Sequence, residues 1–182
     1  MRAAARLFAA QGYHATSMDD LSAATGLAPG GLYHYIERKE QLLIAICDEL
    51  MEPLLERAGE VVGDPEVPAE QRLRALVRVW VAHVVEHRDH MVVFVRERGV
   101  IEREAQWRAV RRSRERFEAL VDELLAAVQA HGGGAFDDRR LALLALLGMV
   151  NHLPSWYRPR GRLSPAQIAD GFCDLLLASH EP

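Results

Sequence analysis

The chain has 182 residues and a mass of 20.4 kDa, of which 49% are hydrophobic and 26% charged. These values exclude wholesale disorder, a collagen-like repeat and a small disulfide scaffold. The formal net charge is −4, from 22 basic and 26 acidic residues, which excludes a polycation that coats nucleic acid or membrane without selectivity. The apolar run 141–150 is too short to span a bilayer and the first residues lack the apolar core of a signal peptide. We therefore expect a cytoplasmic protein that binds no membrane.

Apolar residues recur with the period of a helix along the whole chain, and no segment alternates as a strand does. We expect an all-α fold with a three-helix N-terminal domain over residues 1–37 and a C-terminal helical domain over 38–182. Because the first helix opens at the initiating Met, we also expect that several N-terminal residues are missing. The expected helices span 2–11, 17–24, 28–35, 38–62, 69–88, 91–98, 102–130, 137–154 and 165–179.

The predicted helices contain both cysteines of the chain and one clear helix start. Cys47 and Cys173 lie far apart, each inside an apolar helical pattern, so we expect two buried, reduced thiols. The last helix has the best-defined start, because Ser164 can cap it and Pro165 suits its first position. Gln167 completes a capping box with Ser164.

Residues 16–35 have the pattern of a helix-turn-helix. Thr16 or Ser17 can cap a short helix, and Gly26 supplies the left-handed residue that ends it. Pro29 then suits the first position of a second helix. Such a unit lays its second helix in the major groove of DNA. The alternative is a helical corner that touches no DNA.

The second helix carries few large side chains at its start. Small residues at 28–31 would let the helix N-terminus approach phosphates, which its amides and dipole attract. Tyr33 and His34 are placed to reach the DNA backbone. Lys39, the single lysine of the chain, stands at the start of the next helix and can pair with a phosphate.

The sequences LFAAQGYHATSMDDL at 7–21, GLAPGGLYHYI at 26–36 and KEQLL at 39–43 resemble the TetR family of transcriptional regulators. The resemblance implies a homodimer that binds a palindromic double-stranded DNA operator and usually represses transcription. A small ligand in the C-terminal domain would release it. The sequence shows no Gly-rich phosphate loop, nucleophile elbow or paired-Cys metal site, so we expect no enzyme activity and no cofactor.

Carried over residue by residue, the resemblance implies three groups of DNA contacts. Thr16 and Ser17 match the family's backbone contacts at the second helix of the domain, which is the first of the helix-turn-helix. The base-facing positions match Ala28, Pro29, Gly30 and Gly31, and the phosphate contacts match Tyr33, His34 and Lys39. Two positions depart from the family: Ala28 stands where Ser or Thr usually caps the helix, and Gly31 where a small side chain is common. Few side chains would then contact base edges, and the shape of the operator would contribute more to sequence specificity.

One arginine lies on the apolar seam of the predicted helix 102–130. Arg114 shares this seam, and a cation among apolar positions is costly unless it is paired. It either bonds a nearby glutamate or faces a cavity and receives an anionic ligand. The apolar positions of the seam are Trp107, Val110, Phe117, Val121, Leu124 and Val128. The remaining arginines indicate a solvated face: Arg103, Arg108, Arg111, Arg112 and Arg116.

Residues 141–153 are apolar nearly all round, which a helix tolerates only when both sides are covered. With the amphipathic helix 165–179 they suit a four-helix interface built from two helices of each subunit. The alternative is burial inside one subunit. The resemblance to TetR regulators, which typically dimerise through their last two helices, favours a homodimer.

A short segment after this helix gathers aromatic and basic residues. Trp156 and Tyr157 stand beside Arg158, Arg160 and Arg162. Aromatic faces and guanidinium groups are what an adenine ring and phosphates need. The segment resembles that of TetR regulators that sense acyl-CoA thioesters of lipid or steroid catabolism. The alternatives are a structural loop at the dimer seam and a regulator of another hydrophobic ligand, of the drug or efflux type.

Residues 83–87 fit the His-x-x-Glu-His pattern of one class of zinc peptidases. On a helix, His83 and His87 share a face and could hold a metal ion. They also lie beside the core stripe of an amphipathic helix, and no peptidase scaffold surrounds them. We therefore expect packing or pocket lining rather than a metal site or a zinc hydrolase.

Overall fold

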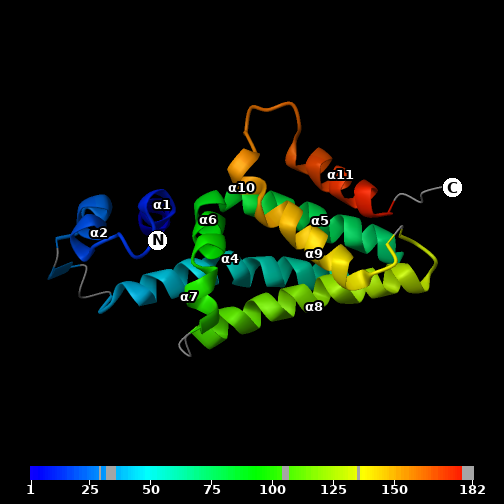
Figure 1. The fold of residues 1–182 in the computed structure, drawn as a ribbon, viewed down its shortest axis with the longest axis horizontal. Coiled ribbons are helices and arrows are strands. Elements are labelled where there is room, and N and C mark those ends of the chain that lie inside the picture. The colour runs from blue at the N-terminus through cyan, green and yellow to red at the C-terminus, as the bar shows by residue number, and fades with distance from the viewer. Residues whose placement is uncertain (29, 32–35, 104–106, 135, 178–182) are drawn as a thin grey trace. The chain divides into compact units, whose positions relative to one another are not determined.

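The computed structural model describes residues 1–28, 30–31, 36–103, 107–134 and 136–177 (Figure 1). These ranges are helical with short connections and contain no strand, so the predicted all-α fold is confirmed. The helices are α1 (Arg2–Gln11), α2 (Met18–Thr25), α4 (Lys39–Val62), α5 (Ala69–Glu86), α6 (Arg88–Arg96), α7 (Arg98–Arg103), α8 (Arg108–Ala130), α9 (Arg139–Asn151), α10 (Leu153–Trp156) and α11 (Pro165–Leu177).

The chain divides into two compact units, each built from two separate segments. Unit 1 comprises Met1–Glu52 and His87–Arg112, and unit 2 comprises Pro53–Glu86 and Ser113–Pro182. This division differs from the boundary expected after residue 37 for two reasons. Helix α6 packs against α1, and α4 contributes residues to both units.

Unit 1 is held together by one hydrophobic core beneath α1, α2 and α6. Phe8, Leu21 and Trp107 are fully buried in it, and Phe8 meets the ring of Tyr13 edge to face with centroids 5.4 Å apart. The backbone N–H of Tyr13 donates to the buried carboxylate of Glu97 over 3.2 Å. This bond ties the connection after α1 to the end of α6.

In unit 2, α11 lies along α5, and α9 and α10 contact the same helix (Figure 1). Arg78 on α5 donates two hydrogen bonds to Asp170 on α11, over 2.6 and 2.9 Å, and these bonds hold the pKa of Asp170 below its usual value. Arg74 pairs with Asp174 one turn along, at 2.7 Å. Polar pairs at the rim therefore fix the register of α11 against α5.

Two predicted helices are interrupted in the structure. The helix expected over 137–154 ends at Asn151 and restarts as α10, because Pro154 lacks an N–H and its ring clashes with the carbonyl four residues earlier. The patterns 91–98 and 102–130 become α6, α7 and α8, with 104–106 outside the described residues. Single-residue breaks at His87 and Glu97 separate α5, α6 and α7, and hydrophobic periodicity does not reveal breaks of that length.

Both cysteines are free and buried, as predicted. Burial raises the pKa of the Cys47 thiol to about 12, with a smaller contribution from Asp48. Burial likewise raises the pKa of Cys173 to about 11. Both are therefore thiols at neutral pH and belong to the core.

No helix among the described residues combines the length and apolar character that crossing a membrane requires.

Candidate functional site

The first helix of the helix-turn-helix, α2, is closed at both ends by its own residues. Ser17 Oγ accepts from the backbone N–H of Asp20 over 3.1 Å, and the Asp20 carboxylate accepts from the N–H of Ser17 over 2.8 Å. The Ser17 hydroxyl also donates to the Asp20 carboxylate over 2.7 Å, and this bond, together with the one from the Ser17 N–H, lowers the pKa of Asp20. Gly26 ends the helix with φ 71°, in the left-handed region. The predicted cap and stop are both confirmed, so the sequence itself defines this element.

The start of the expected second helix carries the glycines at open positions. Gly30 and Gly31 are helical, neither has positive φ, and a Cβ added to either would meet no described atom within 4 Å. Ala28 and Gly30 are exposed. Neither the backbone conformation nor packing against the described part of the chain requires glycine at these two positions. Three other residues expected to contact DNA, Pro29, Tyr33 and His34, lie outside the described residues.

The two residues expected to contact the DNA backbone at α2 differ in exposure. Thr16 is 1% exposed, and its hydroxyl donates to the Gly12 carbonyl over 2.7 Å and accepts from Gln11 over 3.2 Å. This position does not support a phosphate contact by the Thr16 side chain, which instead closes the turn after α1. Ser17 is exposed, and its hydroxyl is bonded to Asp20 in the cap of α2.

Lys39 has contacts that the sequence did not indicate. Its ammonium group donates to the carbonyl oxygens of Tyr13, His14 and Thr16 over 2.8, 3.1 and 2.9 Å. It also lies 4.7 Å from the centroid of the Tyr13 ring. An ammonium group has three hydrogens, so a phosphate contact would require it to give up one of these bonds. In this structure Lys39 fastens the start of α4 to the turn between α1 and α2.

Arg114 has the first of its two expected arrangements. Its Nε lies 3.4 Å from Glu118 Oε1, one turn along α8, and both side chains are mostly buried. A nearby glutamate thus accompanies the cation on the apolar seam. The geometry favours this ion pair over a role for Arg114 as receptor of an anionic ligand.

The aromatic and basic residues of the predicted effector site lie together in and beside the loop between α10 and α11. Trp156 is 45% exposed, and its ring meets Phe172 of α11 with centroids 6.4 Å apart. The loop closes a tight turn in which the N–H of Gly161 donates to the Arg158 carbonyl over 2.8 Å. A Cβ at Gly161 would come within 2.9 Å of that oxygen, so glycine is required there. The exposed arginines of this loop are Arg158, Arg160 and Arg162.

The helices α9 and α11 each have one buried and one open apolar face. On α9, Leu143 and Leu146 are buried, whereas Leu141 is 64% exposed and Leu144 is also open. On α11, Leu175 is 72% exposed. Burial inside one subunit therefore covers only one side of each helix.

A groove of about 640 Å³ lies between α8 and the start of α9. Its size would suit a small ligand. Carboxylates dominate its lining and would repel phosphates, so this groove is a poor site for a nucleotide-like effector. The lining residues are Glu115, Glu118, Ala119, Asp122, Gln129, Asp137, Asp138, Arg139, Arg140 and Leu143.

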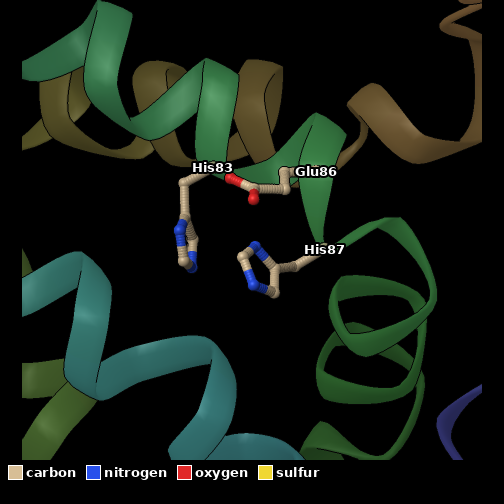
Figure 2. Close-up of side chains that lie close together, drawn as sticks. All are labelled: His83, Glu86 and His87. Atoms are coloured by element: carbon tan, nitrogen blue, oxygen red, sulfur yellow. The ribbon is translucent and has the colours of Figure 1, made fainter. Parts of the chain in front are cut away.

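The His-x-x-Glu-His residues lie at the end of α5 (Figure 2). His83 is completely buried, Glu86 is exposed and His87, which follows the last residue of α5, is half-buried. One donor atom from each of the three lies within 4.8 Å of the others. The spacing that the sequence indicated thus brings the three side chains together.

Comparison with known proteins assigns both parts of the chain. Residues 1–46 match the family described as bacterial regulatory proteins, tetR family, and residues 66–179 match Tetracyclin repressor-like, C-terminal domain. The transcriptional repressor KstR2 of Mycolicibacterium smegmatis is 26% identical over 180 residues, which cover 97% of this chain and 86% of that protein.

Solved structures of regulators also match this chain over nearly its whole length. The structure of AibR in complex with isovaleryl coenzyme A and operator DNA has a TM-score of 0.81 and 29% identity, covering 96% of this chain and 94% of that one. KstR2 of Mycobacterium tuberculosis, at 20% identity and a TM-score of 0.87, shares the fold over 97% of this chain and 92% of its own. With α2 closed by its own caps and both family regions matched in order, the chain belongs to the TetR family of transcriptional regulators, which are DNA-binding proteins and not enzymes.

Proposed function

We propose that the chain is a repressor that binds a palindromic operator as a homodimer and is released by an acyl-CoA thioester. The observation that carries the effector is the exposed Trp156 beside the three arginines of one loop. The similarity to AibR, solved with isovaleryl coenzyme A and operator DNA, supports both halves of the proposal.

The DNA contact rests on the helix that begins near Ala28. No described residue packs against Gly30 or Gly31 and neither has positive φ, so we attribute glycine at these positions to close approach of an outside surface, the floor or wall of the major groove. Backbone amides at the start of the helix would then meet phosphates without an intervening side chain.

Alanine substitution separates this role from folding. Gly30→Ala and Gly31→Ala should each raise the free energy of unfolding by about 0.5–1 kcal/mol, because alanine is the better helix former. Both should weaken binding to a duplex that the parent protein selects from a randomised pool. Gly59→Ala is the control, since Gly59 is also helical, exposed and without described neighbours. Undiminished DNA affinity in the two variants would contradict close approach.

The open apolar faces of α9 and α11 support the homodimer. Leu141, Leu144 and Leu175 would be covered by the same residues of a second subunit, in a four-helix interface. Such a dimer would present two recognition helices to successive major grooves, about 34–36 Å apart.

The effector would use the loop between α10 and α11. The face of Trp156 can stack on an adenine ring, and the guanidinium groups of Arg158, Arg160 and Arg162 can bind phosphates by paired hydrogen bonds. The acyl chain would extend into the helical domain. Binding that favours one spacing of the recognition helices would then lower operator affinity, and operator would lower effector affinity by the same factor.

Calorimetry with isovaleryl-CoA, free coenzyme A and isovalerate tests the effector. The double variant Arg158→Ala/Arg160→Ala should weaken thioester binding at least tenfold, since each hydrogen bond to a charged group contributes about 1.5–3 kcal/mol. Its affinity for DNA should change less. Arg112→Ala/Arg116→Ala removes the same charge from the exposed face of α8 and is the matched control. Failure of the parent protein to bind any CoA thioester would end this part of the proposal, and saturable binding of an uncharged hydrophobic compound would favour an efflux-type regulator.

A further inference from the structure

The residues His83, Glu86 and His87 are not used by the proposed DNA or effector sites. We propose that they bind a divalent late transition-metal ion of the Zn²⁺ type. They stand at positions i, i+3 and i+4 of a continuous stretch, so the local helical backbone brings them to one face. Two imidazole nitrogens and one carboxylate oxygen lie within 4.8 Å of one another (Figure 2).

The distances require only a small closure. Ligand bonds to Zn²⁺ of about 2.0–2.2 Å place tetrahedral donor atoms about 3.3–3.6 Å apart. The three donor atoms must therefore approach by little more than about 1 Å, within the range of side-chain rotation. The buried His83 is held by its surroundings, whereas the exposed Glu86 and the half-buried His87 have room to adjust. The exposed side also gives an ion a path from solvent.

The donor set selects the class of ion. Imidazole nitrogens suit Zn²⁺, Ni²⁺ and Cu²⁺, whereas Mg²⁺ and Ca²⁺ prefer oxygen alone. Three protein ligands leave a fourth position for water. We assign no reaction to the site, because the family is not enzymatic.

Neighbouring residues are compatible with this role. The ring of His90 meets that of His87 edge to face, with centroids 5.7 Å apart, and His90 Nε2 lies 3.1 Å from Glu49 Oε2. The contact between the two rings restrains the orientation of the His87 ring, as residues around a metal ligand commonly do. Arg57 approaches the Glu86 carboxylate only to 3.9 Å, and both side chains are about half exposed, so this ion pair competes weakly with a metal.

Zinc binding by tag-free, full-length protein tests the site. We expect one Zn²⁺ per chain, measured by competition with a chromophoric chelator, and Co²⁺ in its place should give the visible absorption of a low-symmetry four-coordinate ion. His87→Ala and Glu86→Gln should raise the Kd at least about tenfold, since even residues outside the coordination shell change metal affinity by about 10–100-fold. Both positions are partly exposed, so these variants should fold, which circular dichroism will verify.

His131→Ala is the matched control, because His131 is exposed at the end of α8, outside the cluster. Zinc affinity that the cluster variants reduce and the control leaves unchanged supports the proposal. Equal affinity in all of them means adventitious binding elsewhere and overturns it. The absence of stoichiometric zinc binding by the parent protein overturns it as well.

Discussion

Lys39 distinguishes two accounts of how the DNA-binding unit works. If Lys39 contacts a phosphate, it would contribute to DNA affinity alone. If it instead donates three hydrogen bonds to the turn at Tyr13–Thr16, it would contribute to the free energy of unfolding, and it would affect DNA affinity only by positioning α2. We expect the second account to hold, because the three bonds occupy the three hydrogens of the ammonium group.

The size of the effect follows from these contacts. A hydrogen bond to a charged group contributes about 1.5–3 kcal/mol, but the three bonds share one partly exposed cation and are not additive. Lys39→Met keeps the length of the side chain and removes all of them, so we expect a loss of about 2 kcal/mol in the free energy of unfolding. For a domain of this size that corresponds to a fall in Tm of about 4–8 °C.

The assay combines thermal unfolding with DNA binding across a salt series. Each phosphate contact contributes about 0.9 to the slope of log affinity against log salt. A positioning residue, when replaced, lowers affinity and Tm while the salt slope stays constant. Lys39→Arg sharpens the comparison: it keeps a phosphate-binding charge, but its planar fork cannot reach three convergent carbonyls. Normal Tm in both variants, with a flatter salt slope in Lys39→Met alone, would refute the positioning role.

Three other outcomes are expected. Ser17→Ala removes the α2 cap and should lower the free energy of unfolding by about 1 kcal/mol in urea denaturation. Folding lowers the pKa of Asp20 below its unfolded value of 3.8, so the stability that this carboxylate contributes is present above pH 3.8 and is lost as the pH falls through the lower folded value. An Asp20→Asn variant should therefore lose less free energy of unfolding on acidification than the parent protein. Leu141→Asp and Leu175→Asp should each yield monomers in sedimentation velocity. Leu163, exposed in the loop after α10, is the control, and Leu163→Asp should remain a dimer. Dimers in all three variants would exclude the α9–α11 interface.

The features that the sequence predicted well are those set by residues close together in the chain. Ser17 and Asp20 close a cap across three residues, and Gly26 ends the same helix by adopting a conformation that disfavours other residues. Ser164 and Gln167 form the predicted capping box at α11, with bonds of 2.9 and 3.3 Å. Helix identity and these boundaries follow from local chemistry.

The features that the sequence did not predict depend on residues far apart in the chain. Lys39 meets carbonyls 23 to 26 residues earlier, and Glu97 meets the N–H of Tyr13, 84 residues away. Carbonyl and amide groups carry no residue identity, so no pattern of side chains indicates such bonds. Thr16 differs, because its hydroxyl donates to the Gly12 carbonyl only four residues earlier, but that partner is also a main-chain group.

These contacts bear on the source of DNA affinity. The chain is acidic overall, and the single lysine of the DNA-binding unit is engaged with carbonyls. Arg6 of the same unit lies within 4.0 Å of Asp89. Bulk positive charge is therefore a weak source of affinity here. The helix N-terminus offers a short-range source, because its partial positive charge falls off within one turn. Such an interaction requires short distances, which is the physical reason to expect glycine rather than a longer residue at positions 30 and 31.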